Sequence, residues 1–366
     1  MGVPGTFCVV CGCGFANAWD DLEPEIQDAA TITDDERVAQ DFVENHTSDD
    51  FEWLENIRLF GLQSSIKSFR NGNLSQQCCL RADTFEEEPA FFDGITWTEG
   101  IDFSSSEFGD LETLVPNAKG DRLFAMHAEC AEITRLVVNA KAEGLTSGGS
   151  LHSLRALYDA LQHRCDEYFS EFNVIEWDYY GASQYWGYDR WEYEPGFEKY
   201  VASPLRDDGL DTFIANTLKP AAHMQCVPTS VPVNDALSKL ECLPLEIIQD
   251  IAAFLPSASV LHLRSCSRTL RERLPLNQRF FRNGLFTGDL IPHIFDLNPD
   301  LRRMMQHRVP DGEDPNEYWD WRAIARKLVN HKAIAISDPR DTGLPHGFWN
   351  RCRVWTLVEE AQRPAP

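Results

Sequence analysis

The sequence feature that most constrains the fold is residues 243–270, which read LPLEIIQDIAAFLPSASVLHLRSCSRTL. Pro256 follows a run of apolar residues at helical spacing and is expected to end the helix that this run forms, whereas Pro244 precedes the run. Proline is favoured in the first turn of a helix, because its missing N–H group needs no partner there. The first run places apolar residues at i, i+1, i+4, i+7 and i+8, which predicts a helix with one apolar face. These residues are Ile247, Ile248, Ile251, Phe254 and Leu255.

Two further short helices are predicted after the first one. Ser257 can cap the second helix, and Ser265 or Ser267 can cap the third. Leu270 and Leu274 are expected to point inward from the third helix. Three helices this short bury little apolar surface by themselves. The segment is therefore expected either to dock on a partner protein or to be an ordinary three-helix element of a larger core.

The order of residues in this segment resembles an F-box. The resemblance consists of Leu-Pro, the pair Glu246 and Ile247, a second Leu-Pro, and then Leu-x-Leu-Arg and Cys-Ser-Arg, all within 243–274. Elsewhere the segments CVVCG, FAMHAEC and WDWRAIARKL are similar to fungal F-box proteins of one loosely defined group.

An F-box implies the role of an adaptor. Its helices dock on a Skp-type subunit of a cullin–RING ubiquitin ligase, and the rest of the chain selects a protein substrate for ubiquitination. The resemblance implies a helix-in-groove interface with apolar anchors at helical spacing. By position, its residues are Leu243, Pro244, Ile247, Ile251, Leu255, Pro256 and Leu263. The leucine-rich repeats or propellers that are usual in the family are absent from the sequence, so the resemblance implies no substrate. The alternative is a scaffold that uses the F-box outside a ligase.

The negative charge is concentrated in the first two-thirds of the chain. Residues 1–238 carry 15 Lys and Arg against 42 Asp and Glu, a net charge of −27. Residues 239–366 carry 18 against 16, a net charge of +2. A strongly acidic surface repels phosphate backbones and anionic headgroups. We therefore expect neither a nucleic-acid partner nor a membrane partner.

The length of 366 residues leaves room for two or three domains. We expect an α+β, helix-rich fold with a divergent acidic N-terminal domain over 1–201 and a linker over 202–238. The three-helix F-box is expected over 239–280, and a C-terminal helical region over 281–366. The linker is assigned because this segment contains several prolines without helical periodicity, and because the charge balance changes there.

Three elements are predicted within the N-terminal domain. Residues 122–144 place apolar side chains on one side of a helix and end at a glycine. A second helix follows a pair of glycines and can be capped by Ser150 or Ser153. Residues 85–110 are rich in turn-forming residues and are predicted to be an acidic loop.

Two pairs of residues have the spacing of zinc ligands. Cys8-x₂-Cys11 is half of a zinc ligand set, and His127-x₂-Cys130 supplies a second pair. The pairs lie far apart in the sequence, so only the fold can bring them together. We expect these four residues to hold a structural zinc ion. The alternative is that the cysteines pack as small apolar residues and that His127 lines or caps a helix.

No catalytic motif is found in the sequence, which lacks GxSxG, P-loop and HExxH patterns. We therefore expect that the protein is not an enzyme. An unrecognised active site would need titratable groups in a pocket around Trp177–Trp191. Arg351 and Arg353 are expected to pair with carboxylates of the acidic domain.

The 11 cysteines are mostly single, and no basic segment followed by a long apolar stretch precedes them. This pattern favours reduced thiols and a location in the cytoplasm, the nucleus or both.

Overall fold

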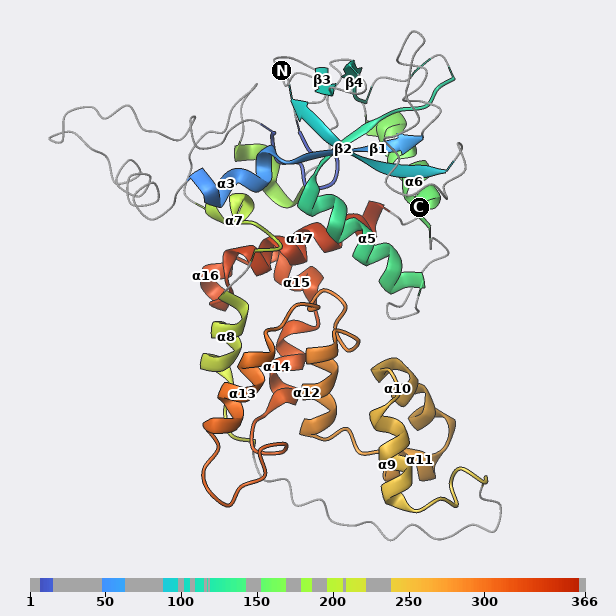
Figure 1. Ribbon diagram of the computed structural model, residues 1–366, viewed down its shortest axis with the longest axis vertical. Coiled ribbons are helices and arrows are strands. Elements are labelled where there is room, and N and C mark those ends of the chain that lie inside the picture. The colour runs from blue at the N-terminus through green and yellow to red at the C-terminus, as the bar shows by residue number, and fades with distance from the viewer. Residues whose placement is uncertain are drawn as a thin grey trace, which may run out of the picture. The chain divides into compact units, whose positions relative to one another are not determined.

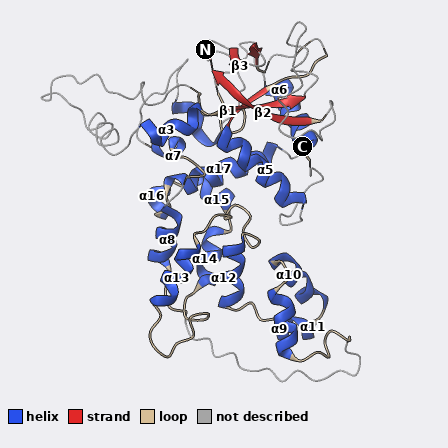
Figure 2. Cartoon of the chain, viewed as in Figure 1, coloured by secondary structure: helices blue, strands red, loops and turns tan. Residues whose placement is uncertain are grey.

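A computed structural model of the chain (Figures 1 and 2) describes residues 7–15, 48–62, 88–97, 102–105, 109–114, 117, 119–142, 153–168, 179–185, 196–206, 209–221 and 238–361. Contacts divide them into two compact units. Unit 1 comprises the described residues of 7–206 together with 331–361, and unit 2 comprises those of 209–330. The expected α+β, helix-rich fold class is confirmed, since strands occur beside a majority of helices (Figure 2).

Unit 1 contains a five-stranded antiparallel sheet with the order β4-β3-β2-β1-β5. Its strands are β1 (Ile57–Leu62), β2 (Pro89–Trp97), β3 (Asp102–Ser105), β4 (Gly109–Glu112) and β5 (Phe124–His127). Strand β1 lies between β2 and β5, and its residues Leu59 and Phe60 are fully buried. In the pairing of β1 with β5, Ile57 stands opposite His127, so the last residue of β5 lies beside the start of β1.

The acidic loop predicted for residues 85–110 is wrong, because strands β2, β3 and β4 lie there. The turn-forming pair Asp93 and Gly94 is absorbed as a bulge: the register of β2 against β1 shifts at this point, and Gly94 has a φ of +74°. Phe92 and Ile95 on either side of the bulge are buried. Their burial in the core, together with the pairing to β1, outweighs the local preference for a turn.

Besides the sheet, unit 1 contains helices (Figure 1). They are α3 (Ser48–Glu55), α5 (Ala128–Ala142), α6 (Leu154–Tyr168), the 3-10 helix η1 (Tyr179–Tyr185), α7 (Glu198–Val201), α15 (His331–Ile336), α16 (Pro339–Thr342) and α17 (His346–Ala361). Helix α17 contacts α5, α6, α7 and α15. Nearly all of its residues are buried.

Sequence periodicity predicted the helices α5 and α6 but not the strand before α5. Residues 124–127 form β5 rather than the first turn of a helix, because they pair with β1. The cap predicted for α6 is present, since the Ser153 hydroxyl accepts a hydrogen bond from the backbone N–H of Ala156 at 3.2 Å.

The regular elements in the described part of unit 2 are all helices, and Pro220 and Trp319 form an isolated β-bridge. The helices are α8 (Gly209–Thr217), α9 (Leu245–Ala253), α10 (Ser257–Cys266), α11 (Arg268–Arg273), α12 (Gln278–Thr287), α13 (Pro299–His307) and α14 (Trp321–Leu328). Helix α9 begins directly after Pro244 and ends ahead of Pro256, as predicted, and α10 begins directly after Pro256. Ser267 caps α11 by accepting a hydrogen bond from the N–H of Leu270.

One predicted cap differs from the structure. Ser257 is the first residue of α10 and not its cap. The carboxylate of Asp289 takes that role, accepting hydrogen bonds from the backbone N–H of Ser257 at 2.8 Å and from its hydroxyl at 2.9 Å. A side chain from beyond α12 thus satisfies a donor that helix α10 leaves open.

The two units cut across the domain boundaries expected from the sequence. Helix α8 lies within the segment 202–238, and residues 222–237 fall outside the described part. The segment 281–366 is divided, because its residues up to 330 belong to unit 2 and the described residues from 331 belong to unit 1.

Candidate functional site

The first half of the candidate metal site is a tight turn near the start of the chain. Phe7 and Gly14 form a β-bridge, and the N–H of Cys8 donates to the carbonyl of Cys13 at 2.8 Å. The N–H of Gly12 donates to the carbonyl of Cys8, also at 2.8 Å, and Gly12 has a φ of +75°. Such a left-handed residue closes the turn and is tolerated best by glycine.

The second half of the site is the junction of β5 and α5. His127 ends β5, and Cys130 lies in the first turn of α5. The junction is fixed by a hydrogen bond of 2.6 Å from the N–H of Ala128 to the carbonyl of Asn56. The turn of residues 7–15 is attached nearby through a hydrogen bond of 3.1 Å from the N–H of Val9 to the carbonyl of Ala125.

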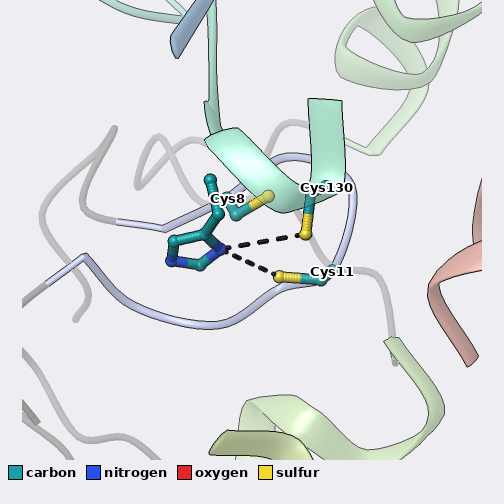
Figure 3. Close-up of side chains that lie close together, drawn as sticks. Cys8, Cys11 and Cys130 are labelled. Atoms are coloured by element: carbon teal, nitrogen blue, oxygen red, sulfur yellow. Dashed lines mark hydrogen bonds between the residues drawn. The ribbon is translucent and has the colours of Figure 1, made fainter. Parts of the chain in front are cut away.

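These two halves bring together all four residues that the sequence singled out. Figure 3 shows the sulfur atoms of Cys8, Cys11 and Cys130 around one ring nitrogen. The Nδ1 atom of His127 lies 3.4 Å from the Cys11 sulfur and 3.9 Å from the Cys130 sulfur. All four donor atoms lie within 4.8 Å of one another. They form a buried cluster that could hold a metal ion.

The imidazole of His127 is held in the orientation that a metal ligand needs. Its Nε2 lies 3.1 Å from the carbonyl oxygen of Gly14, which can only accept, so Nε2 carries the hydrogen. The lone pair of Nδ1 in the neutral ring then faces the sulfur atoms. The rings of Phe15 and Trp53 lie 4.8 and 4.9 Å from the imidazole and restrict its rotation.

The electrostatics of the cluster differ among its thiols. Burial raises the pKa of Cys11 and of Cys130 well above the ordinary value of a thiol. At Cys8 burial acts in the same direction, but hydrogen bonds from Cys11 and Cys130 and the positive charge that His127 carries when protonated outweigh it and lower the pKa. A metal ion would therefore displace protons from the cluster as it binds.

The donor set fits zinc(II) in kind and in spacing. Tetrahedral zinc with bonds of about 2.3 Å to sulfur and about 2.0 Å to nitrogen separates its donors by roughly 3.5–3.8 Å. The separations of His127 Nδ1 from the Cys11 and Cys130 sulfurs, 3.4 and 3.9 Å, bracket that range, and the four donors all lie within 4.8 Å of one another. Four protein ligands with no open position are typical of a structural zinc site rather than a catalytic one.

Two residues beside the cluster were not predicted from the sequence. Tyr179 is buried and donates its hydroxyl hydrogen to the carbonyl of Val9 at 3.2 Å. Arg353 of α17 is fully buried and donates to the carbonyl of Cys11 at 2.7 Å. The expected pairing of Arg353 with a carboxylate is wrong within the described part of the chain, since its partners there are carbonyl, amide and sulfur acceptors. The available signal was an arginine that lies next to large apolar residues in the run RCRVWTLV of α17.

A second candidate site is the surface of helix α9 in unit 2. Leu245 and Ile251 are exposed, Ile247 has 45% of its surface exposed, and Phe254 directly after the helix has 90%. The neighbouring Ile248 is only 2% exposed and therefore faces the core. The helix thus presents apolar side chains on both sides, one to its own unit and one to solvent.

The predicted docking residues all retain surface in the structure. None of the seven is buried: Pro244, Ile247, Ile251 and Pro256 are exposed, and Leu243, Leu255 and Leu263 are half-buried. Leu245, Phe254 and Leu261 are exposed as well but were not assigned to docking. For Phe254 a signal was present, because it follows Ile247 and Ile251 at i, i+4 and i+7.

Hydrogen bonds close the three-helix segment around α9 to α11. The Glu241 carboxylate accepts from the Ser267 hydroxyl and from the N–H of Ser238. Arg273 at the end of α11 donates to the carbonyls of Glu241 and Leu243. These contacts fix the residues before α9 against α11, so the exposed face of α9 is presented by a defined scaffold.

A cavity of about 150 Å³ lies between this segment and α12. Ala252, Leu255 and Leu274 supply part of its apolar lining, and Asn283 and Asp289 contribute polar groups. The Asp289 contact to Ser257 at its margin joins α10 to the residues after α12. The segment 243–274 and α12 are therefore packed together within unit 2.

The other site hypothesis from the sequence, a pocket around Trp177–Trp191, lies only partly within the described residues, which include 179–185 but neither Trp177 nor Trp191. Within the described part, no helix combines the length and the apolar character that crossing a bilayer would require.

Comparison with known proteins agrees with the geometry of 243–274. A family profile described as F-box domain matches residues 240–278. No curated protein and no solved structure matches the chain. The matched range includes α9, α10 and α11 with the contacts that close them. Residues 240–278 of this chain are an F-box domain.

Proposed function

We propose that the chain is a substrate adaptor of a cullin–RING ubiquitin ligase, docking on its Skp-type subunit through the exposed face of α9 and the residues around it. The observation that carries the proposal is the apolar surface of α9 inside an F-box domain, with Phe254 90% exposed. F-box domains typically bind Skp-type subunits in such complexes, and they act as adaptors rather than as enzymes.

The energetics favour a partner on this face. Burying an exposed Leu, Ile or Phe side chain contributes about 1.5–3 kcal/mol when burial is complete. Several such residues lie within two turns of α9, and contiguous apolar surface of this kind marks interaction sites. The proposed interface consists of the seven residues within 243–263 that were assigned from the sequence, together with the exposed Leu245, Phe254 and Leu261.

The remaining parts of the proposal concern the substrate and its location. Unit 1 is proposed to recruit a protein substrate, because it has its own core and carries most of the acidic residues. Its charge disfavours nucleic acid and anionic membranes as partners. The complex is proposed to act in the cytoplasm, the nucleus or both.

The test is co-precipitation of a Skp-type subunit and a cullin with the full chain. Wild type is compared with Ile247→Ala/Ile251→Ala, and Val329→Ala is the control because Val329 is an exposed apolar residue outside the F-box. We expect both partners with wild type and with the control, and neither with the double variant. Recovery of the Skp-type subunit without cullin would replace the ligase role by a non-ligase scaffold. Recovery of neither with wild type would overturn the proposal.

We also propose that Cys8, Cys11, His127 and Cys130 hold a structural zinc ion. The support is the buried cluster of four donors and the hydrogen bond that orients His127. Zinc would join the turn of 7–15 to the β5–α5 junction, and such sites contribute directly to folding.

Elemental analysis of the purified chain tests the zinc proposal. We expect about one equivalent of zinc in wild type, as for a closed four-ligand site, and loss of it in Cys11→Ser. Cys165→Ser is the matched control, since Cys165 is equally buried but lies in α6 outside the cluster. Zinc-free wild type, or equal zinc in both variants, would contradict the proposal.

A further inference from the structure

One guanidinium connects three distant segments beside the metal cluster. Arg353 donates from Nη1 to the carbonyls of Cys11 at 2.7 Å and Tyr179 at 3.0 Å. Its Nε donates to the side-chain oxygen of Asn350 at 3.0 Å, and its Nη2 lies 3.4 Å from the Cys13 sulfur. The planar guanidinium suits this task, because its five N–H groups have fixed directions.

The buried positive charge of Arg353 needs a negative charge nearby. Arg353 is 0% exposed and a guanidinium stays protonated in proteins. In the described part of the chain, its hydrogen-bond partners include no carboxylate. A buried charge without a partner of opposite sign is strongly destabilising. The acceptors that can become negative at this place are the cysteine sulfurs.

The metal-bound cluster would supply the negative charge that balances the positive charge of Arg353. Zinc(II) bound by three thiolates and one neutral imidazole has one net negative charge. The cluster residues are buried, so this charge also needs compensation. One buried arginine beside such a centre makes the whole group neutral.

We propose that Arg353 is a positioning residue of the metal centre, which balances its net negative charge and holds the Cys11 carbonyl in place. This inference rests on the metal binding proposed above. It adds a residue from α17, far from the ligands in sequence, and it explains why an arginine is fully buried at this position of the helix. Loss of the metal would leave Arg353 without a compensating charge and would weaken the attachment of α17 to the turn of 7–15.

The chain offers a matched control in the same helix. Arg351 is also 0% exposed, but its Nε donates to the carbonyl of Pro204 at 2.7 Å. No hydrogen bond from Arg351 to Cys11 or Cys13 occurs among the described residues. Replacing Arg351 therefore removes a buried arginine from α17 without removing the proposed counter-charge of the cluster.

The experiment measures metal affinity in the folded full chain by chelator competition, with zinc(II) and cobalt(II) as probes. Cobalt(II) also reports thiolate coordination by its charge-transfer absorption. Wild type is compared with Arg353→Met, Arg353→Lys and Arg351→Met. We expect a loss of about 10–100-fold in affinity for Arg353→Met, as for other residues that support metal ligands. Arg353→Lys keeps the charge and is expected to retain part of the affinity, and Arg351→Met is expected to bind like wild type.

The outcomes separate the two proposals. Absence of metal binding in wild type would overturn the zinc proposal and this inference with it. Metal binding in wild type with equal affinities for Arg353→Met and Arg351→Met would overturn only the inference. Arg353→Lys binding as weakly as Arg353→Met would refute the charge balance. Disappearance of the effect in a Cys13→Ser background would mean that Arg353 serves Cys13 instead of the metal centre.

Discussion

Substitution of Gly12 by alanine isolates the contribution of the turn to the metal cluster. Gly12 has a φ of +75°, and a Cβ atom there would lie 2.5 Å from Cδ2 and 2.7 Å from Cβ of Tyr179. Gly343, also in unit 1, has a φ of +66° but no atom within 4 Å of an added Cβ. Both substitutions place an alanine in a left-handed backbone conformation, and only Gly12→Ala adds a clash with a buried ring.

The expected difference follows from these two geometries. Left-handed backbone costs alanine about 1–2 kcal/mol at either position. The gain from a less flexible unfolded chain is also common to both. Displacing the buried Tyr179 ring adds about 1–3 kcal/mol to Gly12→Ala, the usual cost of overpacking. We therefore expect Gly12→Ala to lower the free energy of unfolding of unit 1 by about 1–3 kcal/mol more than Gly343→Ala.

The assay is chemical denaturation of the full chain, in which unfolding is monitored by hydrogen exchange of peptides from α5 and α17. Peptide resolution is needed because the chain has two units, and a single transition cannot be assumed. Metal content is measured on the same samples, and only Gly12→Ala is expected to reduce it. Equal destabilisation by the two variants, with equal metal content, would refute the proposed contact between turn and ring.

Three further predictions concern α9, the cap of α10 and the metal. Ile248→Ala should lower the free energy of unfolding of unit 2 by about 2–5 kcal/mol, because it leaves a cavity at a core position. Ile247→Ala should change that free energy by no more than about 0.5 kcal/mol but should weaken binding of the Skp-type subunit. Denaturation and calorimetric titration check both, and equal stability effects would contradict the assigned orientation of α9. Asp289→Ala should cost about 1–2 kcal/mol through the lost cap at Ser257. Asp289→Asn should destabilise unit 2 less than Asp289→Ala, because its amide oxygen can still accept a hydrogen bond from Ser257. Equal denaturation midpoints for the two variants would contradict this. Chelation should make Cys130 reactive to alkylation in mass spectrometry, and unchanged reactivity would argue against a bound metal.

The sequence predicted the helices of the F-box because their signals are local. Pro244 marks the start of the first helix and Pro256 its end, and Ser267 caps the third helix. The orientation of α9 was not predictable in full, because adjacent isoleucines at 247 and 248 belong to the same apolar stripe. The packing of α9 within unit 2, which includes its contact with α11, decides which one is buried.

The sheet and the surroundings of the cluster depend on contacts between distant residues. Asp93 and Gly94 look like a turn in the sequence, and only the pairing with β1 makes them a bulge. The spacing within each cysteine or histidine pair was visible, but their meeting depends on β5 lying beside the turn of 7–15. Arg353 could not be assigned, because its role follows from the position of α17 in the fold.

The most direct test of the central proposal is a hydrogen-exchange footprint of a purified Skp-type subunit on the full chain. We expect a stable complex with protection concentrated in residues 243–263, and loss of that protection in Ile247→Ala/Ile251→Ala. Absence of a complex with wild type, or protection confined to residues outside the F-box domain, would contradict it.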